Sequence, residues 1–254
     1  MINVEALGFS YPNSAPILTD LSVDIKAGEI LGIAGPNGAG KSTFFKLLLN
    51  LLKPTHGHIK LNNQPLNALS PKELATQIAW IGASIDCPFH YTVSQIVKMG
   101  RYPHRKTFSD LFYQPDDAIE EALSLTGLTP LKHRFFHQLS SGEQQLVYLA
   151  RAFAQDPKLL LMDEAISHLD LKRQAQIKDI LIAKNRTDNL SIVMISHHLN
   201  FLSQFANQLL LLDAGKRIAH GPPKQVLTQK TLEELYGKAI RTATGENGRP
   251  LVYI

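Results

Sequence analysis

The sequence predicts an α/β fold with a mainly parallel sheet, and three observations support this prediction. Short apolar runs at residues 159–162, 191–195 and 209–212 are flanked by polar turns, as strands buried on both faces of a parallel sheet are. A glycine-rich loop at 35–42 lies between an apolar run and a helical segment. Residues 90–156 have helical character with few β-branched runs, which indicates a helical insertion between that loop and the later strands.

Individual elements follow from the pattern of apolar residues. Leu21, Val23 and Ile25 alternate with polar residues, which is the period of a half-buried strand. The other predicted elements are a strand at 29–34 after a turn at Gly28, a helix at 41–52 ended by Lys53-Pro54, a strand and hairpin turn at 59–63, and a helix at 144–155 ended by Asp156-Pro157. No internal repeat is visible.

Composition excludes several classes of protein. The chain has 254 residues, of which 44% are hydrophobic and 19% charged, so it can form a full core and is not disordered. Its formal charge of +4 does not require a nucleic acid partner, and we expect none. A single cysteine, Cys87, rules out an internal disulfide and favours a reducing compartment. Residues 1–5 lack the features of a signal peptide, and the richest apolar run, 44–52, is too short to span a bilayer. We therefore expect a soluble, cytoplasmic protein that needs another chain for any membrane process.

The loop at 35–42 fits the phosphate-binding pattern G-x-x-x-x-G-K-[ST]. Glycines allow the backbone to bend so that its N–H groups point at phosphate oxygens, and the following helix adds the positive end of its dipole. The Lys41 side chain can reach the outer phosphates, and the Ser42 hydroxyl can hold Mg²⁺. A merely structural glycine turn is the alternative. The loop alone indicates that the protein binds a nucleotide. It does not decide the class of protein, because kinases, GTPases and ATPases share this loop. Its residues are Gly35, Pro36, Asn37, Gly38, Ala39, Gly40, Lys41 and Ser42.

Further motifs narrow the class of nucleotide-binding protein. The segment L-S-S-G-E-Q-Q at 139–145 precedes the helix at 144–155. An apolar strand then delivers Asp163 and Glu164 to its C-terminal end, where ligands of open α/β sheets bind. Asp163 is placed to hold Mg²⁺ through water, and Glu164 to orient or activate the attacking water. The segment 167–170 follows, and a later strand ends at His197.

Together these motifs make the sequence resemble the ATP-binding cassette (ABC) ATPases over essentially the whole chain. The resemblance rests on the Walker A loop at 35–43, the signature at 139–145, the Walker B strand at 159–164, the D-loop at 167–170 and the switch histidine, His197. It implies a P-loop NTPase fold of ABC type, with a RecA-like parallel-sheet core, an N-terminal antiparallel β subdomain and an inserted helical subdomain. We expect one ABC ATPase domain over 1–254, with the nucleotide-binding core and β subdomain at 1–84 and 157–254 and the helical subdomain at 85–156.

The resemblance also implies roles for single residues. Tyr11 looks like the aromatic residue that stacks on adenine, with an ordinary strand aromatic as the alternative. Thr43 joins Lys41 and Ser42 as a phosphate or metal contact. His197 looks like the residue that contacts the γ-phosphate, rather than its neighbour His198, with a buried structural histidine as the alternative. The signature residues Ser140, Ser141 and Gly142 would contact the γ-phosphate of the ATP held by a second subunit, and Glu143 belongs to the same signature. Asp170 belongs to the D-loop.

In this family two subunits pair head to tail around two ATP molecules. The resemblance implies in-line attack of water on the γ-phosphate, stabilised by Mg²⁺, Lys41 and the partner's signature. ATP binding would close the dimer, and closure would drive a membrane partner.

The sequence departs from the family pattern at several positions. The usual glutamine that contacts Mg²⁺ and the attacking water is replaced by Ala83, and Gln77 and Gln95 lie at the wrong spacing. Hydrolysis is therefore expected to be slow, unless Ser84 or Asp86 substitutes. Ser141 stands where a second glycine is more usual, Leu146 where arginine is common, and Ala165 where proline is common.

Residues 91–104 look like the subgroup of ABC ATPases that energises import of iron-siderophores, haem and cobalamin. The basic cluster at 101–106, which ends at Lys106, has Phe89, Tyr91 and Phe108 nearby and would lie near the surface where the membrane subunit docks, with a solvated loop as the alternative. This subgroup implies polytopic permease subunits, a periplasmic or surface substrate-binding protein, and a position on the cytoplasmic face of the membrane. A weakly hydrolysing regulatory subunit and a non-transport ABC ATPase remain alternatives. His56 and His58 lack further ligands at metal spacing, so we expect no metal site there.

Overall fold

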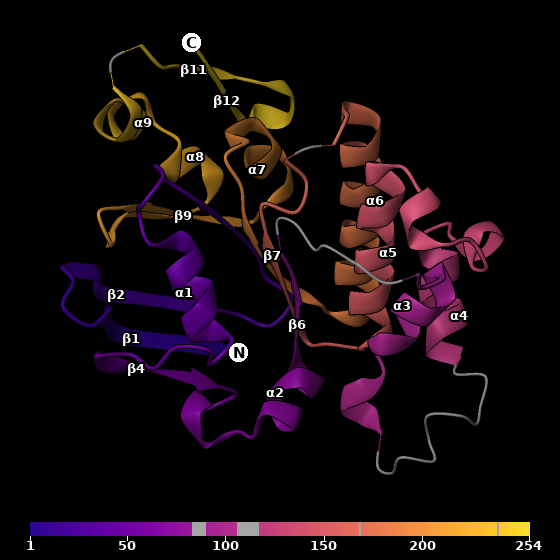
Figure 1. Cartoon of the computed structure of the whole chain (residues 1–254). Helices are drawn as coiled ribbons and strands as arrows, with labels where there is room; N and C mark the ends of the chain where they lie inside the picture. The colour runs from indigo at the N-terminus through magenta and orange to yellow at the C-terminus, as the bar shows by residue number, and fades with distance from the viewer. Residues whose placement is uncertain (83–89, 106–116, 168, 238) are drawn as a thin grey trace. The chain divides into compact units, whose positions relative to one another are not determined.

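The computed structural model describes residues 1–82, 90–105, 117–167, 169–237 and 239–254 (Figure 1). The chain forms two compact units. The first comprises Met1–Leu69 with Ser191–Ile254, and the second comprises Ser70–Leu190.

An antiparallel sheet forms part of the first unit. Its strand order is β2-β1-β4-β5, with β1 at Ile2–Ser10, β2 at Pro16–Ile25, β4 at His56–Leu61 and β5 at Gln64–Pro65. Leu21, Val23 and Ile25 are buried on β2, which confirms the predicted alternation. The predicted hairpin turn joins β4 to β5, where Asn62 and Asn63 both have positive φ, as tight hairpin turns require.

The same unit contains parallel strands. Strand β3 (Ile30–Ala34) pairs in parallel with β8 (Ser191–Ile195) and with β9 (Gln208–Asp213), and β10 (Lys216–Gly221) runs antiparallel to β9. Every residue of β3 and β8 is buried, as predicted for strands covered on both faces. The expected α/β class with parallel strands is confirmed.

Helix α1 (Lys41–Leu48) ends earlier than the sequence pattern predicted. Asn50 takes the left-handed conformation with φ 55°, and the N–H groups of Leu51 and Leu52 both donate to Lys46 O, at 2.9 and 3.3 Å. This turn satisfies the last carbonyls of the helix and stops it before Lys53-Pro54 is reached. The prediction of a helix to Leu52 is wrong by one turn.

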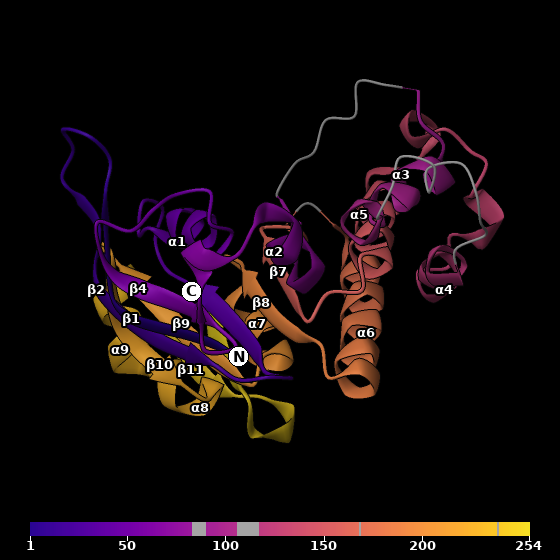
Figure 2. The same cartoon turned by 90° about the horizontal axis from the view of Figure 1, so that it is seen from below.

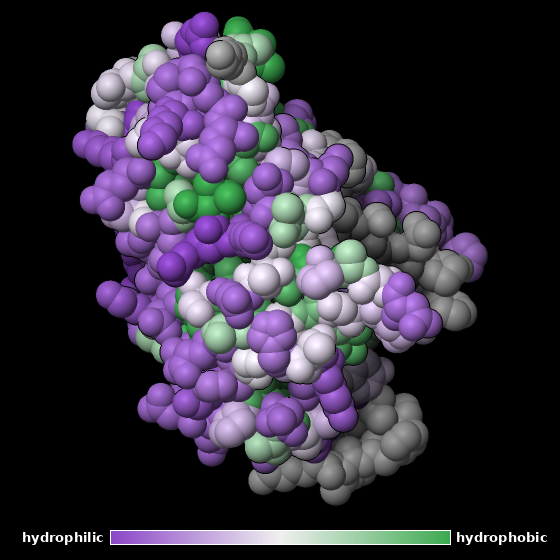
Figure 3. All heavy atoms as spheres, turned by 90° about the vertical axis from the view of Figure 1, so that its left-hand side faces the viewer, coloured by the Kyte–Doolittle hydropathy of each residue, from purple (hydrophilic) through white to green (hydrophobic). Residues whose placement is uncertain are grey.

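The C-terminal part of the first unit adds helices α7 (Leu199–Phe205), α8 (Pro223–Val226) and α9 (Gln229–Tyr236), and a hairpin of β11 (Arg241–Thr244) and β12 (Pro250–Tyr253). The side chain of Asn200 on α7 forms hydrogen bonds to this hairpin as the backbone of a third strand would. Its Nδ2 donates to Val252 O at 2.9 Å, and its Oδ1 accepts from Val252 N at 2.7 Å. The face seen in Figure 3 is mostly hydrophilic, with apolar side chains in small separate groups.

The second unit is mainly helical. It contains α2 (Pro71–Gln77), α3 (Val93–Met99), α4 (Asp117–Leu125), α5 (Ser141–Ala154), α6 (Leu171–Asp188) and the parallel strands β6 (Ile78–Ile81) and β7 (Leu159–Asp163). Helix α5 packs against α3 and α4 (Figure 2). Helical character within 90–156 is confirmed for the described residues. Helix α6 has no predicted counterpart, because it buries only Ile177 and Leu181 and lacks a clear apolar stripe.

Short 3₁₀ helices connect these elements, at Leu66–Ala68, Tyr102–His104, Thr129–Leu131, Phe136–Gln138 and Glu246–Gly248. Among the described residues, no helix combines the length and the apolar character needed to cross a bilayer.

Candidate functional site

The phosphate loop follows β3 directly and leads into α1. Its first glycine, Gly35, has a φ of +151°, and a Cβ there would lie 2.0 Å from Leu212 O on β9. Only glycine fits this close approach of two backbones. The glycines at 38 and 40 also have positive φ, and the first turn of α1 contains no acidic residue. The loop therefore presents backbone N–H groups and a helix N-terminus to an anion without a competing carboxylate.

Lys41 occupies the centre of this loop. Its side chain is buried, with 7% exposure, and its Nζ donates to Gly35 O and to Pro36 O, each at 2.8 Å. Ser42 is exposed on the next position of α1, and Thr43 is partly exposed. An ammonium held by loop carbonyls can exchange them for phosphate oxygens, and an exposed hydroxyl beside it is a suitable ligand for Mg²⁺. The residues present thus fit a nucleotide with its metal.

His197 lies at the same sheet edge as the loop. Strands β3 and β8 are parallel neighbours, with Ile33 paired to Ile195, so their carboxyl ends lie together. Ser196 N donates to Ile33 O at 3.2 Å and fixes the chain there. His197 is exposed, which argues against the alternative of a buried structural histidine. His198 is also exposed, but its N–H donates to Ser196 Oγ, and it caps α7.

Tyr11 follows the end of β1 and is 37% exposed. Its ring packs edge-on against Phe9, with the ring centroids 4.8 Å apart. The Tyr11 ring is thus positioned by Phe9 and is still accessible to solvent. A ring in this position is able to stack on a base. The alternative of an ordinary strand aromatic stays open.

Tyr236, on α9, is a residue of this region that the sequence did not indicate. Burial and the nearby charge of Asp213 raise the pKa of its phenol, while a backbone hydrogen bond from Gly35 acts in the opposite direction. Its hydroxyl therefore supports the first glycine of the phosphate loop. No motif contains Tyr236, because α9 follows the loop by some two hundred residues and only folding brings them together.

In the second unit, β7 delivers Asp163 and Glu164 to its carboxyl end, as predicted. Glu164 has a φ of +51°, a left-handed conformation that is uncommon for any residue except glycine. Ser167 holds this turn, because both its N–H and its Oγ donate to Glu164 O, at 3.2 and 2.8 Å. Such strain, on the order of 1–3 kcal/mol, is typical of functional positions.

The signature forms the first turn of α5 rather than the loop before it. Ser140 is the N-cap, and it forms a capping box with Glu143. Glu143 Oε2 accepts hydrogen bonds from Ser140 N at 2.9 Å and from Ser140 Oγ at 2.8 Å, and these bonds hold the pKa of Glu143 below its ordinary value. The helix was predicted to start at 144; the spacing S-x-x-E at 140–143 was the available signal for its true start.

Two glutamines hold the signature segment and the D-loop in the same way. Gln144 Nε2 donates to Phe136 O and Leu139 O, at 3.2 and 3.3 Å. Gln174 Nε2 donates to Ile166 O and Leu169 O, at 3.3 and 3.0 Å. In both cases the glutamine lies in the first turns of a helix and binds carbonyls five and eight residues earlier.

Asp170 caps the helix that follows the D-loop. Its Oδ1 accepts a hydrogen bond from Arg173 N at 2.8 Å, so Asp170 is the N-cap of α6. Several residues of the sequence predictions lie outside the described residues: Ala83, Ser84, Asp86, Cys87 and Phe89, Lys106 and Phe108 of the docking surface, and His168 of the D-loop.

Other polar groups were also considered as sites. His56 Nε2 lies 3.5 Å from Asp20 Oδ1, and His58 Nε2 lies 2.9 Å from Glu5 Oε2, so each histidine has its own carboxylate. Within the described part of the chain, no three histidine, cysteine or acidic side chains are grouped as metal ligands.

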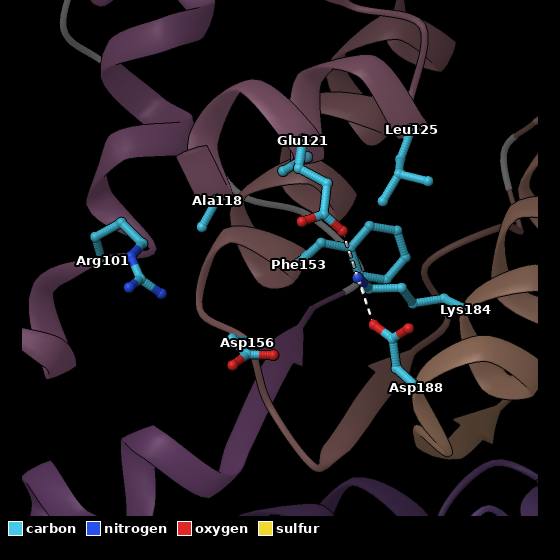
Figure 4. Close-up of a pocket in the computed structure, with 9 residues that line it drawn as sticks. Arg101, Ala118, Glu121, Leu125, Phe153, Asp156, Lys184 and Asp188 are labelled. Carbon is cyan, nitrogen blue, oxygen red and sulfur yellow. Dashed lines mark hydrogen bonds and ion pairs between the residues drawn. The ribbon is translucent and has the colours of Figure 1, made fainter. Parts of the chain in front are cut away.

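A hollow of about 220 Å³ lies in the second unit (Figure 4). Lys184 bridges Glu121 and Asp188 there, at 3.1 and 2.6 Å, above the ring of Phe153. Burial alone would lower the pKa of Lys184, but its hydrogen bonds to the two carboxylates raise it. Lys184 thus forms an ion pair with each carboxylate, and its pair with Glu121 joins α4 to α6.

Comparison with known proteins decides the family. Residues 18–167 match the family model described as ABC transporter. The chain belongs to the ABC transporter family. Relatives include the petrobactin import ATP-binding protein FpuD of Bacillus anthracis, 32% identical over 96% of this chain and 89% of the relative. Another is the ferric enterobactin transport ATP-binding protein FepC of Escherichia coli (strain K12), 33% identical over 87% of this chain and 82% of the relative. The hemin import ATP-binding protein HmuV of Thermobifida fusca (strain YX) is 35% identical over 93% of this chain and 82% of the relative.

Solved ABC structures confirm the fold. A putative metal-chelate type ABC transporter in an inward-facing conformation matches with a TM-score of 0.82 and 31% identity, covering 99% of this chain and 96% of that chain. The dimeric ABC transporter cassette MJ0796 matches with a TM-score of 0.75 and 25% identity, covering 87% and 98%. The expected ABC ATPase fold is thereby confirmed. ATP-binding subunits of this family are ATPases that bind ATP, dimerise and work with membrane permease subunits.

The structure explains one departure from the ABC pattern. Leu146 is 2% exposed on α5, where its side chain belongs to the apolar core of the second unit. An arginine buried at this position would need a polar partner, whereas leucine needs none. Ala165 is likewise buried, directly after the strained Glu164.

Proposed function

We propose that this chain is the ATP-hydrolysing subunit of an importer for an iron-siderophore, haem, cobalamin or another metal chelate. The observation that carries the proposal is near full-length similarity to import ATP-binding proteins for petrobactin and hemin and to a ferric enterobactin transport ATP-binding protein. The match to a metal-chelate type transporter supports it independently. Residues 91–104, which suggested the same subgroup, add support from the sequence.

Within this proposal, residues of the chain have distinct roles. Lys41 and the loop N–H groups of 35–43 hold the phosphates, and Tyr11 stacks on adenine. Ser42 and Asp163 would hold Mg²⁺, which supplies positive charge to the β- and γ-phosphate oxygens when bound. Glu164 orients the attacking water and takes up its proton, and His197 contacts the γ-phosphate. Ser140, Ser141, Gly142 and Glu143 serve ATP bound to a second copy, and Asp170 orders the D-loop beside that interface.

The assembly proposed is a pair of copies that enclose two ATP molecules and work beneath permease subunits. The helical subdomain, 85–156, would carry the signature, and 1–84 with 157–254 would form the nucleotide-binding core. A periplasmic or surface protein would deliver the cargo, and the chain would act at the cytoplasmic face of the membrane. Closure of the pair on ATP would supply the conformational change that the permease needs.

Purification with the cognate permease tests this proposal. The complex in proteoliposomes should take up one of a panel of labelled ferric enterobactin, haem and cobalamin only when ATP is supplied. Glu164→Gln should abolish turnover and uptake, while Glu234→Gln, an exposed carboxylate on α9, should leave both unchanged. ATP hydrolysis without uptake of any metal chelate would refute the import assignment.

A weakly hydrolysing regulatory subunit is a second candidate, favoured by alanine at position 83. It predicts turnover near background even in the assembled complex. Measurable turnover that Glu164→Gln abolishes would exclude it.

A further inference from the structure

Gly142 is covered by the side chain of Arg173. A Cβ on Gly142 would lie 3.1 Å from Arg173 Cγ and 3.2 Å from Arg173 Nε, tighter than ordinary van der Waals contact. Gly142 lies within the first turn of α5, so its backbone is helical and does not itself need glycine. The glycine instead leaves room for the arginine stem, which crosses it from α6.

The position of Arg173 is fixed from both directions along α6. Its N–H donates to the N-cap, Asp170, and its NH1 donates to Gln176 Oε1 at 2.8 Å. The neighbouring Gln174 ties the start of the same helix to the D-loop. A guanidinium held in this way loses little further freedom when it acts on a neighbouring charge.

The charge beside Gly142 creates a need for such a cation. The only acidic residue in the first turn of α5 is Glu143, and its hydrogen bonds to Ser140 keep it ionised. A carboxylate suits a helix N-terminus, but it repels a polyphosphate that approaches the same turn. Two cations act on Glu143, Arg173 and Arg134, and both lower its pKa further. Arg173 also supplies the three atoms that lie nearest to a Cβ built on the signature glycine.

We propose that Arg173 is a positioning residue for ATP hydrolysis. Packed on Gly142, its guanidinium offsets the negative charge of Glu143 and lets the signature turn accept the terminal phosphate of ATP bound to a second copy. This inference rests on the proposed function, because it needs the signature to serve ATP in trans. It assigns to α6 a role in nucleotide affinity that the signature sequence alone does not reveal.

The test compares four versions of the complete transporter complex: unmodified, Arg173→Met, Glu143→Gln, and both changes together. Methionine keeps the apolar stem over Gly142 and removes the charge, while glutamine at 143 can still complete the capping box. The measurement is the KM for ATP and kcat, at low and at high salt. Arg186→Met, an exposed arginine near the other end of α6, is the matched control.

We expect Arg173→Met to raise the KM for ATP about threefold to tenfold at low salt, with a smaller effect at high salt and little change in kcat. The double variant should return to within about twofold of Glu143→Gln, because no charge then needs an offset. Arg186→Met should leave the KM unchanged. Thermal unfolding of each variant checks that the fold is retained.

Two results would overturn the inference: an unchanged KM in Arg173→Met, or a raised KM that Glu143→Gln fails to restore. Absence of turnover in the unmodified complex would instead refute the proposed function. Titration of the four proteins with a fluorescent ATP analogue repeats the comparison for binding alone. An unchanged Kd in Arg173→Met, or a raised Kd that Glu143→Gln fails to restore, would again overturn the inference.

Discussion

Ser140 and Glu143 hold one another at the start of α5, with the serine hydroxyl and N–H both donating to one carboxylate oxygen. Ser70 and Glu73 form the same arrangement at the start of α2, with the two bonds at 2.7 and 2.8 Å. The described residues thus include a Ser–Glu capping box in the signature and a matching one outside every motif.

This pair separates a stabilising role from a functional one. Ser140→Ala and Ser70→Ala should each reduce the free energy of unfolding by about 1 kcal/mol, because each removes an N-cap. Only Ser140→Ala should also reduce ATP turnover strongly. Urea unfolding and steady-state ATPase assays check this, and equal activity in the two variants would contradict the role of the signature serine.

Lys41 should be required for stabilisation by ATP. Because its ammonium already lies inside the phosphate loop, Lys41→Met should bind Mg-ATP far more weakly. Unmodified protein should gain about 2.7 kcal/mol of stability at ATP concentrations near a hundred times Kd, and the variant should gain almost none. Thermal shift measurements with and without Mg-ATP test this. Lys46→Met, an exposed lysine on the same helix, should respond like the unmodified protein. An undiminished shift in Lys41→Met would contradict the assignment.

Glu29 should make stability depend on pH. Burial raises the pKa of its carboxyl above the ordinary value of 4.5, more than the opposing bond from the Lys26 backbone lowers it. The folded state therefore holds the proton more tightly than the unfolded state. The stability contributed by protonated Glu29 is complete below about pH 4.5 and is lost as the pH rises through the folded pKa.

Glu29→Gln should consequently be more stable than the unmodified protein at pH 7 and should show no gain below pH 4. Urea unfolding across this pH range measures the difference. The exposed control Glu234→Gln should show no such trend. A gain that grows toward acid pH would contradict the sign of the pKa shift.

Ala83→Gln restores the residue that the family usually has. We expect the ATPase rate of the assembled complex to rise or stay the same, because a missing polar contact of this kind costs roughly ten- to a hundredfold in rate. Steady-state assays with the permease present measure it. A large loss of activity would mean that this loop uses a different ligand.

Much of the site was readable from the sequence because its chemistry lies in contiguous motifs. The apolar runs at β7, β8 and β9 and the phosphate loop before α1 lie where the pattern placed them. The sequence prediction failed where the local backbone conformation determines the end of a helix or the shape of a turn. Asn50 ends α1 early through a left-handed turn, and Glu164 takes a strained φ that no pattern announces.

Contacts between distant segments were equally hidden. Helix α6 has too few buried apolar residues to show a helical period, so neither the helix nor Arg173 could be anticipated. The contact between Arg173 and Gly142 joins residues that belong to different motifs. Tyr236 meets Gly35 only through the fold. Sequence motifs thus identify the reacting groups, and tertiary structure identifies the groups that position them.

The central claim is that two copies of this chain enclose ATP, with the phosphate loop of one copy and the signature of the other on the same nucleotide. A structure of Glu164→Gln crystallised with Mg-ATP tests it most directly. We predict a pair of copies in which Gly142 N of one lies within about 3 Å of a γ-phosphate oxygen of the ATP held by Lys41 of the other. ATP bound at Lys41 with no signature from another copy against its γ-phosphate would contradict the account.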